Sequence, residues 1–253
     1  MVAALGLVIT INGIFIPMLL EEGAKEIISM GFVQRTKTNA KEIWYGLKIR
    51  PLYRCIIFFF IFSGVIPSYS DYFYYYLTDV LEFNDFQYSI LNVVSTFTLI
   101  IAVYFYNLWF KDIESAWMLI ACCVINIIGS INSMSLVLGF TFGMSPDAFV
   151  FLSNTVTDTL NNCIQLLSGN VLFAKLIPAN IESSMFAILT GIINLCHFFV
   201  AKQLGNFFNL FVGVNDENLE DLWVLFLITA VCSIIPIFFI WLVPRRKEVF
   251  LVQ

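Results

Sequence analysis

Long apolar stretches alternate with short polar breaks along most of the chain. A helix needs about 20 apolar residues to cross roughly 30 Å of hydrocarbon, at 1.5 Å of rise per residue. Seven stretches reach this length, over residues 1–20, 55–80, 87–110, 116–140, 148–174, 183–213 and 222–243. The pattern therefore predicts an all-α membrane protein with about seven transmembrane helices, the first over residues 1–20 and the others forming a six-helix bundle over residues 55–243.

The composition supports this interpretation and excludes other classes of protein. Of the 253 residues, 60% are hydrophobic and 12% are charged, against roughly 45–50% apolar and about 25% charged residues in soluble domains. We therefore expect the lipid bilayer as a partner. The six Cys lie in apolar runs and the single His belongs to no ligand cluster, so neither a metal nor a cofactor is expected. Because phosphate-loop, catalytic-triad and dinucleotide motifs are missing, we expect neither an enzyme nor a nucleic-acid partner.

The basic residues predict the orientation in the membrane. The connector over residues 21–54 carries seven of the 13 Lys and Arg residues. With this connector in the cytoplasm, alternating crossings place Lys111, Lys175 and the basic residues of the tail over 244–253 on the same side. The opposite loops then contain only acidic residues. Within the connector, Ile43, Trp44 and Leu47 are spaced for a short helix at the bilayer interface.

The first apolar run, over residues 1–20, has a second interpretation as a signal peptide. It begins with Met1 but lacks a basic leading segment, and it is longer than the apolar core of an ordinary signal peptide. We therefore expect a crossing there, with the N-terminus outside and the C-terminus inside. The sequence does not distinguish between two host membranes, the plasma membrane and the inner membrane of a mitochondrion or plastid.

The fifth stretch carries a row of polar side chains. Asp158 lies near the middle of this predicted crossing, where an ionised group costs on the order of 3 kcal/mol unless it faces protein or a wet cavity. At 3.6 residues per turn, four amide side chains share with Asp158 a stripe of the helix surface about 100° wide: Asn154, Asn161, Asn162 and Gln165. The row predicts the lining of a cavity for a planar heterocycle. The alternative is a hydrogen-bond network that only holds helices together.

The second stretch combines a proline, an acid and several tyrosines. Pro67 removes its own N–H group and predicts a kink. Asp71 is expected toward the outer mouth, as a gating or recognition residue. Tyr75 and its neighbouring tyrosines could stack on a flat ring, although clustered tyrosines also form interfacial belts.

The sixth stretch places small and polar residues at helical spacing. Gly191, Asn194, Lys202 and Gly205 share one face with Ala187, a pattern typical of tight helix packing. Lys202 is expected near the outer end, where it either extends to the interface or meets an anionic ligand. His197 lies off this face and is expected in the core or at the lipid interface.

Four segments together resemble a known family. They are PSYSDYFYYYLTDVLEF over residues 67–83, the YN pair at 106–107 before Lys111, LIPANIESSMFAILTGIIN over 176–194, and LGNFFNLFVGVNDENLEDLWVLFLI over 204–228. With these, the chain resembles the C-terminal half of the folate–biopterin transporter family, a branch of the major facilitator superfamily. The resemblance implies that residues 1–20 correspond to helix six of twelve, residues 21–54 to the linker between halves, and the rest to the C-terminal bundle.

The resemblance also implies a function. Such transporters bind substrate between two bundles and alternate its access to either side, so the expectation is transport of folate or pteridine substrates, with proton coupling as an option. The substrate-binding residues would be Asp158, Asn154, Asn161, Gln165, Asp71, Tyr75 and Asn194. The family pattern places an acid where this chain has Asn154, which leaves the register and any proton role of Asp158 open.

One bundle offers half of such a site, so we expect a second chain that completes the fold, or a larger membrane complex. The alternative function is a non-transporting structural subunit of a larger membrane protein complex. It is motivated by the first five helices of the family, which have no counterpart here, and by the turn over residues 107–115, which keeps only Lys111 and Asp112 of the superfamily's charged gating loop.

Overall fold

The computed structural model describes residues 37, 41, 43–177, 182–215 and 218–245. The chain divides into two units, residues 1–47 and residues 48–253. The predicted crossing over 1–20 and most of the connector over 21–54 lie outside the described residues, as do the last eight residues of the tail. In the first unit, residues 43–47 are helical, with Trp44 and Tyr45 exposed.

All regular elements that the structure describes within residues 48–253 are helices, which confirms the all-α fold class. They are α4 (Arg50–Gly64), α5 (Ser70–Tyr75), η1 (Tyr76–Val80), α6 (Asp85–Phe105), η2 (Tyr106–Phe110), α7 (Ser115–Val137), α8 (Pro146–Phe149), η3 (Val150–Asn154), α9 (Thr155–Leu176), α10 (Glu182–Leu195), η5 (Cys196–Val200), α11 (Ala201–Val212), α12 (Leu222–Cys232), α13 (Ile235–Phe238) and η6 (Ile240–Leu242). The elements η1, η2, η3 and η5 are π-helical, and η6 is a 3-10 turn.

Four helical stretches among the described residues are long and apolar enough to cross a membrane. They are Asp85–Phe110, Ser115–Val137, Ser184–Val212 and Leu222–Leu242, and each begins within two residues of the start of a predicted crossing. The other two predicted crossings within residues 48–253, over 55–80 and 148–174, are not among these four stretches. The second is interrupted between α4 and α5, and the fifth contains α9, which carries the row of polar side chains.

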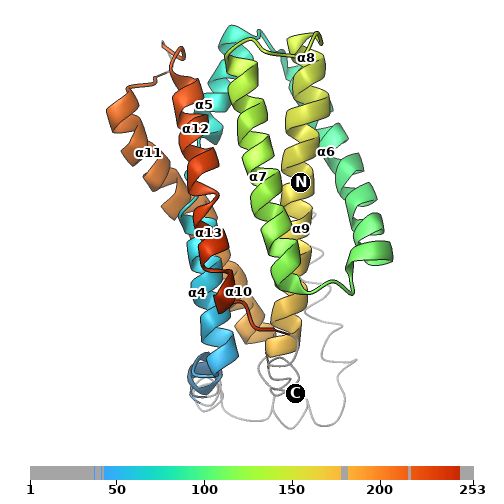
Figure 1. Ribbon diagram of the computed structural model, residues 1–253, viewed down its shortest axis with the longest axis vertical. Coiled ribbons are helices and arrows are strands. Elements are labelled where there is room, and N and C mark those ends of the chain that lie inside the picture. The colour runs from blue at the N-terminus through green and yellow to red at the C-terminus, as the bar shows by residue number, and fades with distance from the viewer. Residues whose placement is uncertain (1–36, 38–40, 42, 178–181, 216–217, 246–253) are drawn as a thin grey trace, which may run out of the picture. The chain divides into compact units, whose positions relative to one another are not determined.

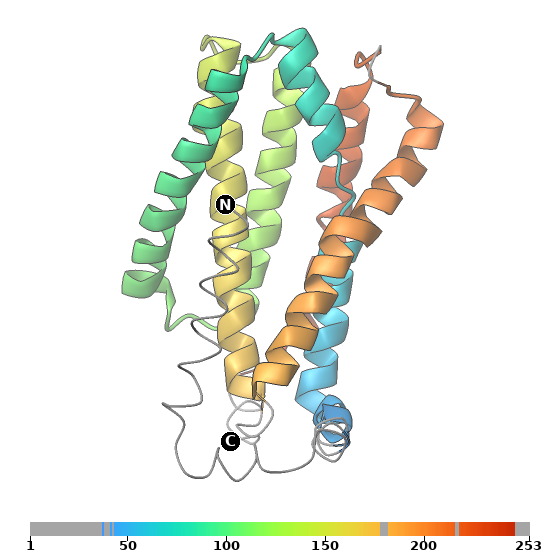
Figure 2. The same ribbon diagram turned by 180° about the vertical axis from the view of Figure 1, so that it is seen from behind.

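The helices of the second unit pack side by side (Figure 1). Helix α9 packs against both α6 and α7, α7 also packs against α12, and α12 packs against α11. Figure 2 shows the same order from behind, with α4 beside α10. Leu77 of η1, Phe149 of α8 and Leu222 at the start of α12 belong to one buried apolar cluster. The ring of Phe59 on α4 lies 5.0 Å, centroid to centroid, from that of Phe173 on α9.

The start of α6 is fixed by local hydrogen bonds. The Asn84 side chain accepts a bond from the Gln87 N–H at 2.9 Å, and the Asn84 N–H donates to the Gln87 side chain at 3.0 Å. These two bonds form a capping box, which satisfies backbone donors at the helix start. Gln87 also donates to the Asp147 carboxylate at 3.1 Å, so the same side chain connects α6 to α8.

The second crossing contains a full interruption where Pro67 predicts a kink. Helix α4 ends at Gly64 and α5 begins at Ser70. Proline lacks the N–H that a helix needs, and it disfavours the helical conformation of the residue before it. Neighbouring helices satisfy part of the freed backbone, because Ser68 N–H donates to the Ala201 carbonyl at 3.1 Å and Thr229 Oγ1 donates to the Pro67 carbonyl at 3.3 Å.

A glycine allows α11 to approach this interruption. A Cβ atom at Gly205 would lie 2.5 Å from the Ser68 carbonyl oxygen and 3.2 Å from the Tyr69 ring. By contrast, a Cβ atom at Gly191 would meet no atom of the described residues within 4 Å. Of the small residues predicted to pack tightly on one face, Gly205 therefore makes a close backbone contact and Gly191 does not.

We expect Gly205→Ala to destabilise the protein, because its methyl group overlaps a backbone carbonyl that cannot rotate away. Overpacking of this kind costs about 1–3 kcal/mol. The measurement is thermal unfolding of the purified protein in detergent, with Gly191→Ala as the matched control. Equal melting temperatures for the two variants would contradict the close contact at Gly205.

Candidate functional site

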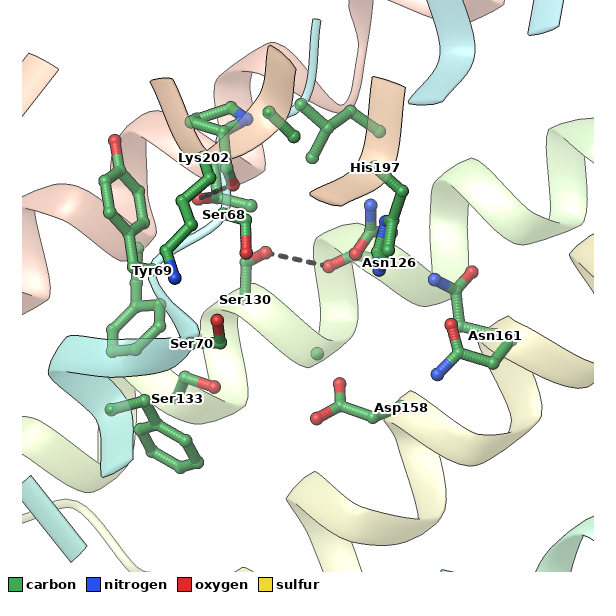
Figure 3. Close-up of a pocket in the computed structure, with 18 of the residues that line it drawn as sticks. Ser68, Tyr69, Ser70, Asn126, Ser130, Ser133, Asp158, Asn161, His197 and Lys202 are labelled. Carbon is green, nitrogen blue, oxygen red and sulfur yellow. Dashed lines mark hydrogen bonds between the residues drawn. The ribbon is translucent and has the colours of Figure 1, made fainter. Parts of the chain in front are cut away.

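A cavity of about 550 Å³ lies beside the interruption of the second crossing. Its walls come from α4, the interruption, α5, η1, α6, α7, α9, η5, α11 and α12, and Figure 3 shows part of this lining. The polar side chains in its lining, other than tyrosines, are Ser63, Ser68, Ser70, Asn126, Ser130, Ser133, Asp158, Asn161, Asn162, Gln165, His197, Lys202 and Thr229. The volume falls in the range of small-molecule sites, about 300–1,000 Å³.

The structure brings together three of the predicted site residues on α9. Asp158, Asn161 and Gln165 all line the cavity, as does Asn162. Gln165 Nε2 donates to Ser63 Oγ at 3.4 Å, which connects α9 to the end of α4. A Cβ atom at Gly129 would lie 3.4 Å from Asp158 Oδ1, so the small residue on α7 leaves room for this carboxylate.

Asn154 lies in a different environment from the other members of the predicted row. Its side chain is 2% exposed, and its Nδ2 donates to Ser133 Oγ at 2.8 Å. It is the last residue of the π-helix η3, whose wider turn shifts the phase of the residues before α9. Asn154 therefore bonds α7 to the start of α9 and is absent from the cavity lining.

Asp71 is connected to the cavity through an ion pair with Lys202. Its Oδ2 atom lies 2.6 Å from Lys202 Nζ, an ion pair between α5 and α11. Lys202 lines the cavity, and Asp71 does not. In the described structure Lys202 therefore contacts a carboxylate of its own chain.

The two remaining predicted site residues lie outside the lining. Tyr75 is exposed and contacts the ring of Tyr74 edge-on at 6.0 Å. Tyr74 does line the cavity, and its ring also meets that of Tyr88 at 5.3 Å. Asn194 is exposed near the end of α10 and is absent from the lining.

His197 is the main residue that the sequence placed differently. It was expected off the polar face, whereas the structure has it in the cavity lining together with Lys202. It belongs to the π-helix η5, in which residues five apart share a face, unlike in an α-helix. Figure 3 shows the side chain of Asp158 on α9 extending toward the same space as those of His197 and Lys202, which lie on the continuous helical stretch Ser184–Val212.

Hydroxyl and amide groups on α7 also join the site without having been predicted. Asn126, Ser130 and Ser133 line the cavity, and Ser130 Oγ donates to the Asn126 carbonyl at 2.9 Å. Their spacing of four and three residues is that of one α-helical face. This spacing is the signal that could have identified them in the sequence.

The lining combines groups of opposite chemistry. It contains the carboxylate of Asp158, the ammonium of Lys202 and the imidazole of His197, with amides and hydroxyls between them. Within the described part of the chain, no three His, Cys, Asp or Glu residues are grouped as metal ligands would be. The arrangement can bind an organic solute that has both hydrogen-bond donors and acceptors.

Several curated proteins are similar to this chain. A probable folate-biopterin transporter of Arabidopsis thaliana is 24% identical over 88% of this chain. A folate-biopterin transporter of Synechocystis is 23% identical over 82% of the chain, and a folate transporter of Plasmodium falciparum is 22% identical over 84%. These relatives are named as transporters and not as enzymes, in agreement with the expectation from the sequence.

The chain spans less than half the length of these relatives, at 45%, 42% and 42% of each. No solved structure matches it. The model of the BT1 family matches residues 3–250, nearly the whole sequence. This chain therefore belongs to the BT1 family.

Proposed function

We propose that this chain binds a folate or pteridine in the cavity beside Pro67 and carries it across the membrane as one bundle of a two-bundle transporter. The observation that supports this most is the position of the cavity. It lies where a predicted membrane-crossing helix is interrupted, and transporters commonly form their binding sites at such discontinuous helices. The names of the curated relatives indicate the class of substrate.

The chemistry of the lining suits a pteridine ring. The ring system carries an amino group, a ring N–H and a carbonyl along one edge. A carboxylate accepts hydrogen bonds from two adjacent donors, a role we assign to Asp158. Asn161 and Gln165 offer both donors and acceptors to the rest of the edge. Phe73 and Tyr74 also line the cavity, and their rings offer faces for stacking.

Alternating access requires a second surface against which this bundle can move. The chain covers less than half of each curated relative, so we propose that another bundle completes the site. In such a carrier the cavity opens first to one side of the membrane and then to the other. Asp158, whose side chain is accessible from the cavity, is the group that we propose for proton coupling.

We expect Asp158→Asn to lower uptake of labelled folate or pterin by roughly ten-fold or more. The amide replaces one acceptor oxygen by a donor, and it removes the charge that strengthens both hydrogen bonds. The measurement is uptake into vesicles that contain the purified protein, repeated over a series of pH values. Membrane insertion is expected to be unchanged, since the side chain is accessible in the cavity.

The matched control is Asp79→Asn, which removes an exposed carboxylate outside the cavity lining. The amide can still accept the bond that Thr78 Oγ1 donates to Asp79. Uptake by Asp158→Asn equal to that of the control, at every pH, would remove Asp158 from the mechanism.

Asn154→Ala is expected to have the opposite profile, with lower stability and unchanged affinity for ligand. The variant removes the buried bond to Ser133, and bonds between membrane helices contribute about 0.6 kcal/mol on average and up to about 1.7 kcal/mol. Unfolding in detergent and ligand binding by the same sample measure the two effects. Ser135→Ala is the control, because among the described residues its hydroxyl donates to the Ile131 carbonyl within the same helix, α7. A weaker affinity without a loss of stability would place Asn154 in the binding site.

A further inference from the structure

We infer that Lys202 makes the site selective for ligands that carry a carboxylate. In the described structure its ammonium holds Asp71, and it exchanges this carboxylate for that of the ligand when the cavity is occupied. The inference rests on the proposed function and narrows its substrate class. Folate carries a glutamate moiety with two carboxylates, whereas biopterin carries none.

The position of Lys202 allows this exchange. It lines the cavity, whereas its partner Asp71 lies outside the lining, so the ammonium stands at the boundary between the cavity and α5. The Nζ–Oδ2 distance is 2.6 Å, and the side chains are 45% and 54% exposed. Both ends of the pair are therefore accessible to water and to a solute.

The energetics also favour exchange. An exposed ion pair typically changes an equilibrium by no more than about five-fold. Separating a buried pair would instead change the binding equilibrium unfavourably by more than about a hundred-fold. A ligand carboxylate can thus replace Asp71 at low cost, and Lys202 stays paired before and after binding.

The distribution of charge in the cavity matches a ligand with two different ends. Asp158 enters from α9 and Lys202 from α11 (Figure 3). Among the described residues of the lining, Lys202 is the only Lys or Arg. A donor-rich ring at Asp158 leaves the anionic end of folate for Lys202, with His197 as a second donor. An uncharged pterin gains nothing from this ammonium.

The test compares folate with its diamide, in which both carboxylates of the glutamate moiety are amidated. The two compounds have the same ring system and nearly the same size, so they differ mainly in charge. Binding of each labelled compound is measured on the purified full chain in lipid nanodiscs. For Lys202→Met we expect roughly ten-fold weaker binding of folate and unchanged binding of the diamide. The charge-assisted bond to the ligand, which contributes up to about a hundred-fold, is lost, and it outweighs the exposed pair with Asp71, which contributes no more than about five-fold.

Two further variants control for general loss of charge and for folding. Lys111→Met removes an exposed ammonium just after η2, outside the lining, and is expected to bind both compounds as the wild type does. Asp71→Asn frees Lys202 from its partner and is expected to strengthen folate binding by up to about five-fold. The double variant, which leaves neither charge unpaired, is expected to bind folate as weakly as Lys202→Met does.

The outcomes separate this inference from the function on which it rests. A wild-type protein that binds neither compound would overturn the proposed function, and the inference with it. A wild type that binds both, with Lys202→Met weakening both equally or neither, would overturn the role of Lys202 alone. Weaker folate binding by Asp71→Asn would show that the ion pair itself, and not its exchange, supports the site.

Discussion

Backbone hydrogen bonding is the constraint on which the site depends. Inside hydrocarbon every N–H and C=O group must find a partner, so an unwound segment persists only against protein or water. The segment at Pro67 meets this condition on two sides, through the Ala201 carbonyl and the Thr229 hydroxyl. Gly205 lets α11 come close enough for the first of these contacts, and the cavity lies beside the same segment. The cavity and the interruption are thus parts of one arrangement.

The sequence predicted those features that depend on a regular period. The length of the apolar stretches predicted the helices, because a membrane crossing requires about 20 apolar residues. The 3.6-residue period placed Asp158, Asn161 and Gln165 on one face, and the structure has all three in the cavity lining. The same period failed at Asn154 and His197, because each lies in a π-helical turn that shifts the phase. π-turns have no simple sequence signal, and they occur frequently at functional sites.

The helical period of the sequence does not predict contacts between segments that are distant in sequence. Asp71 and Lys202 are separated by most of the bundle in sequence. The sequence predicts an acid at the outer mouth for Asp71, and for Lys202 a base that extends to the interface or meets an anionic ligand. Their pairing requires the interruption at Pro67, which allows α5 to begin anew beside α11. A proline predicts a kink, but the extent of unwinding and the direction in which the helix resumes depend on neighbouring helices.

The chemistry of the lining also bears on whether such a bundle transports or only supports a larger assembly. A structural subunit packed against apolar neighbours would bury Asp158, Lys202 and His197 in a dry interface, where unpaired polar groups cost free energy. The side-chain oxygen of Asn161 and the hydroxyl of Tyr69 already have no hydrogen-bond partner among the described residues. A hydrated cavity supplies partners for such groups, and a polar ligand can take the place of that water. Because the acid, the base and the amides all come from this chain, we propose that a second bundle would contribute mainly the moving wall, while recognition of the solute depends on the residues described here.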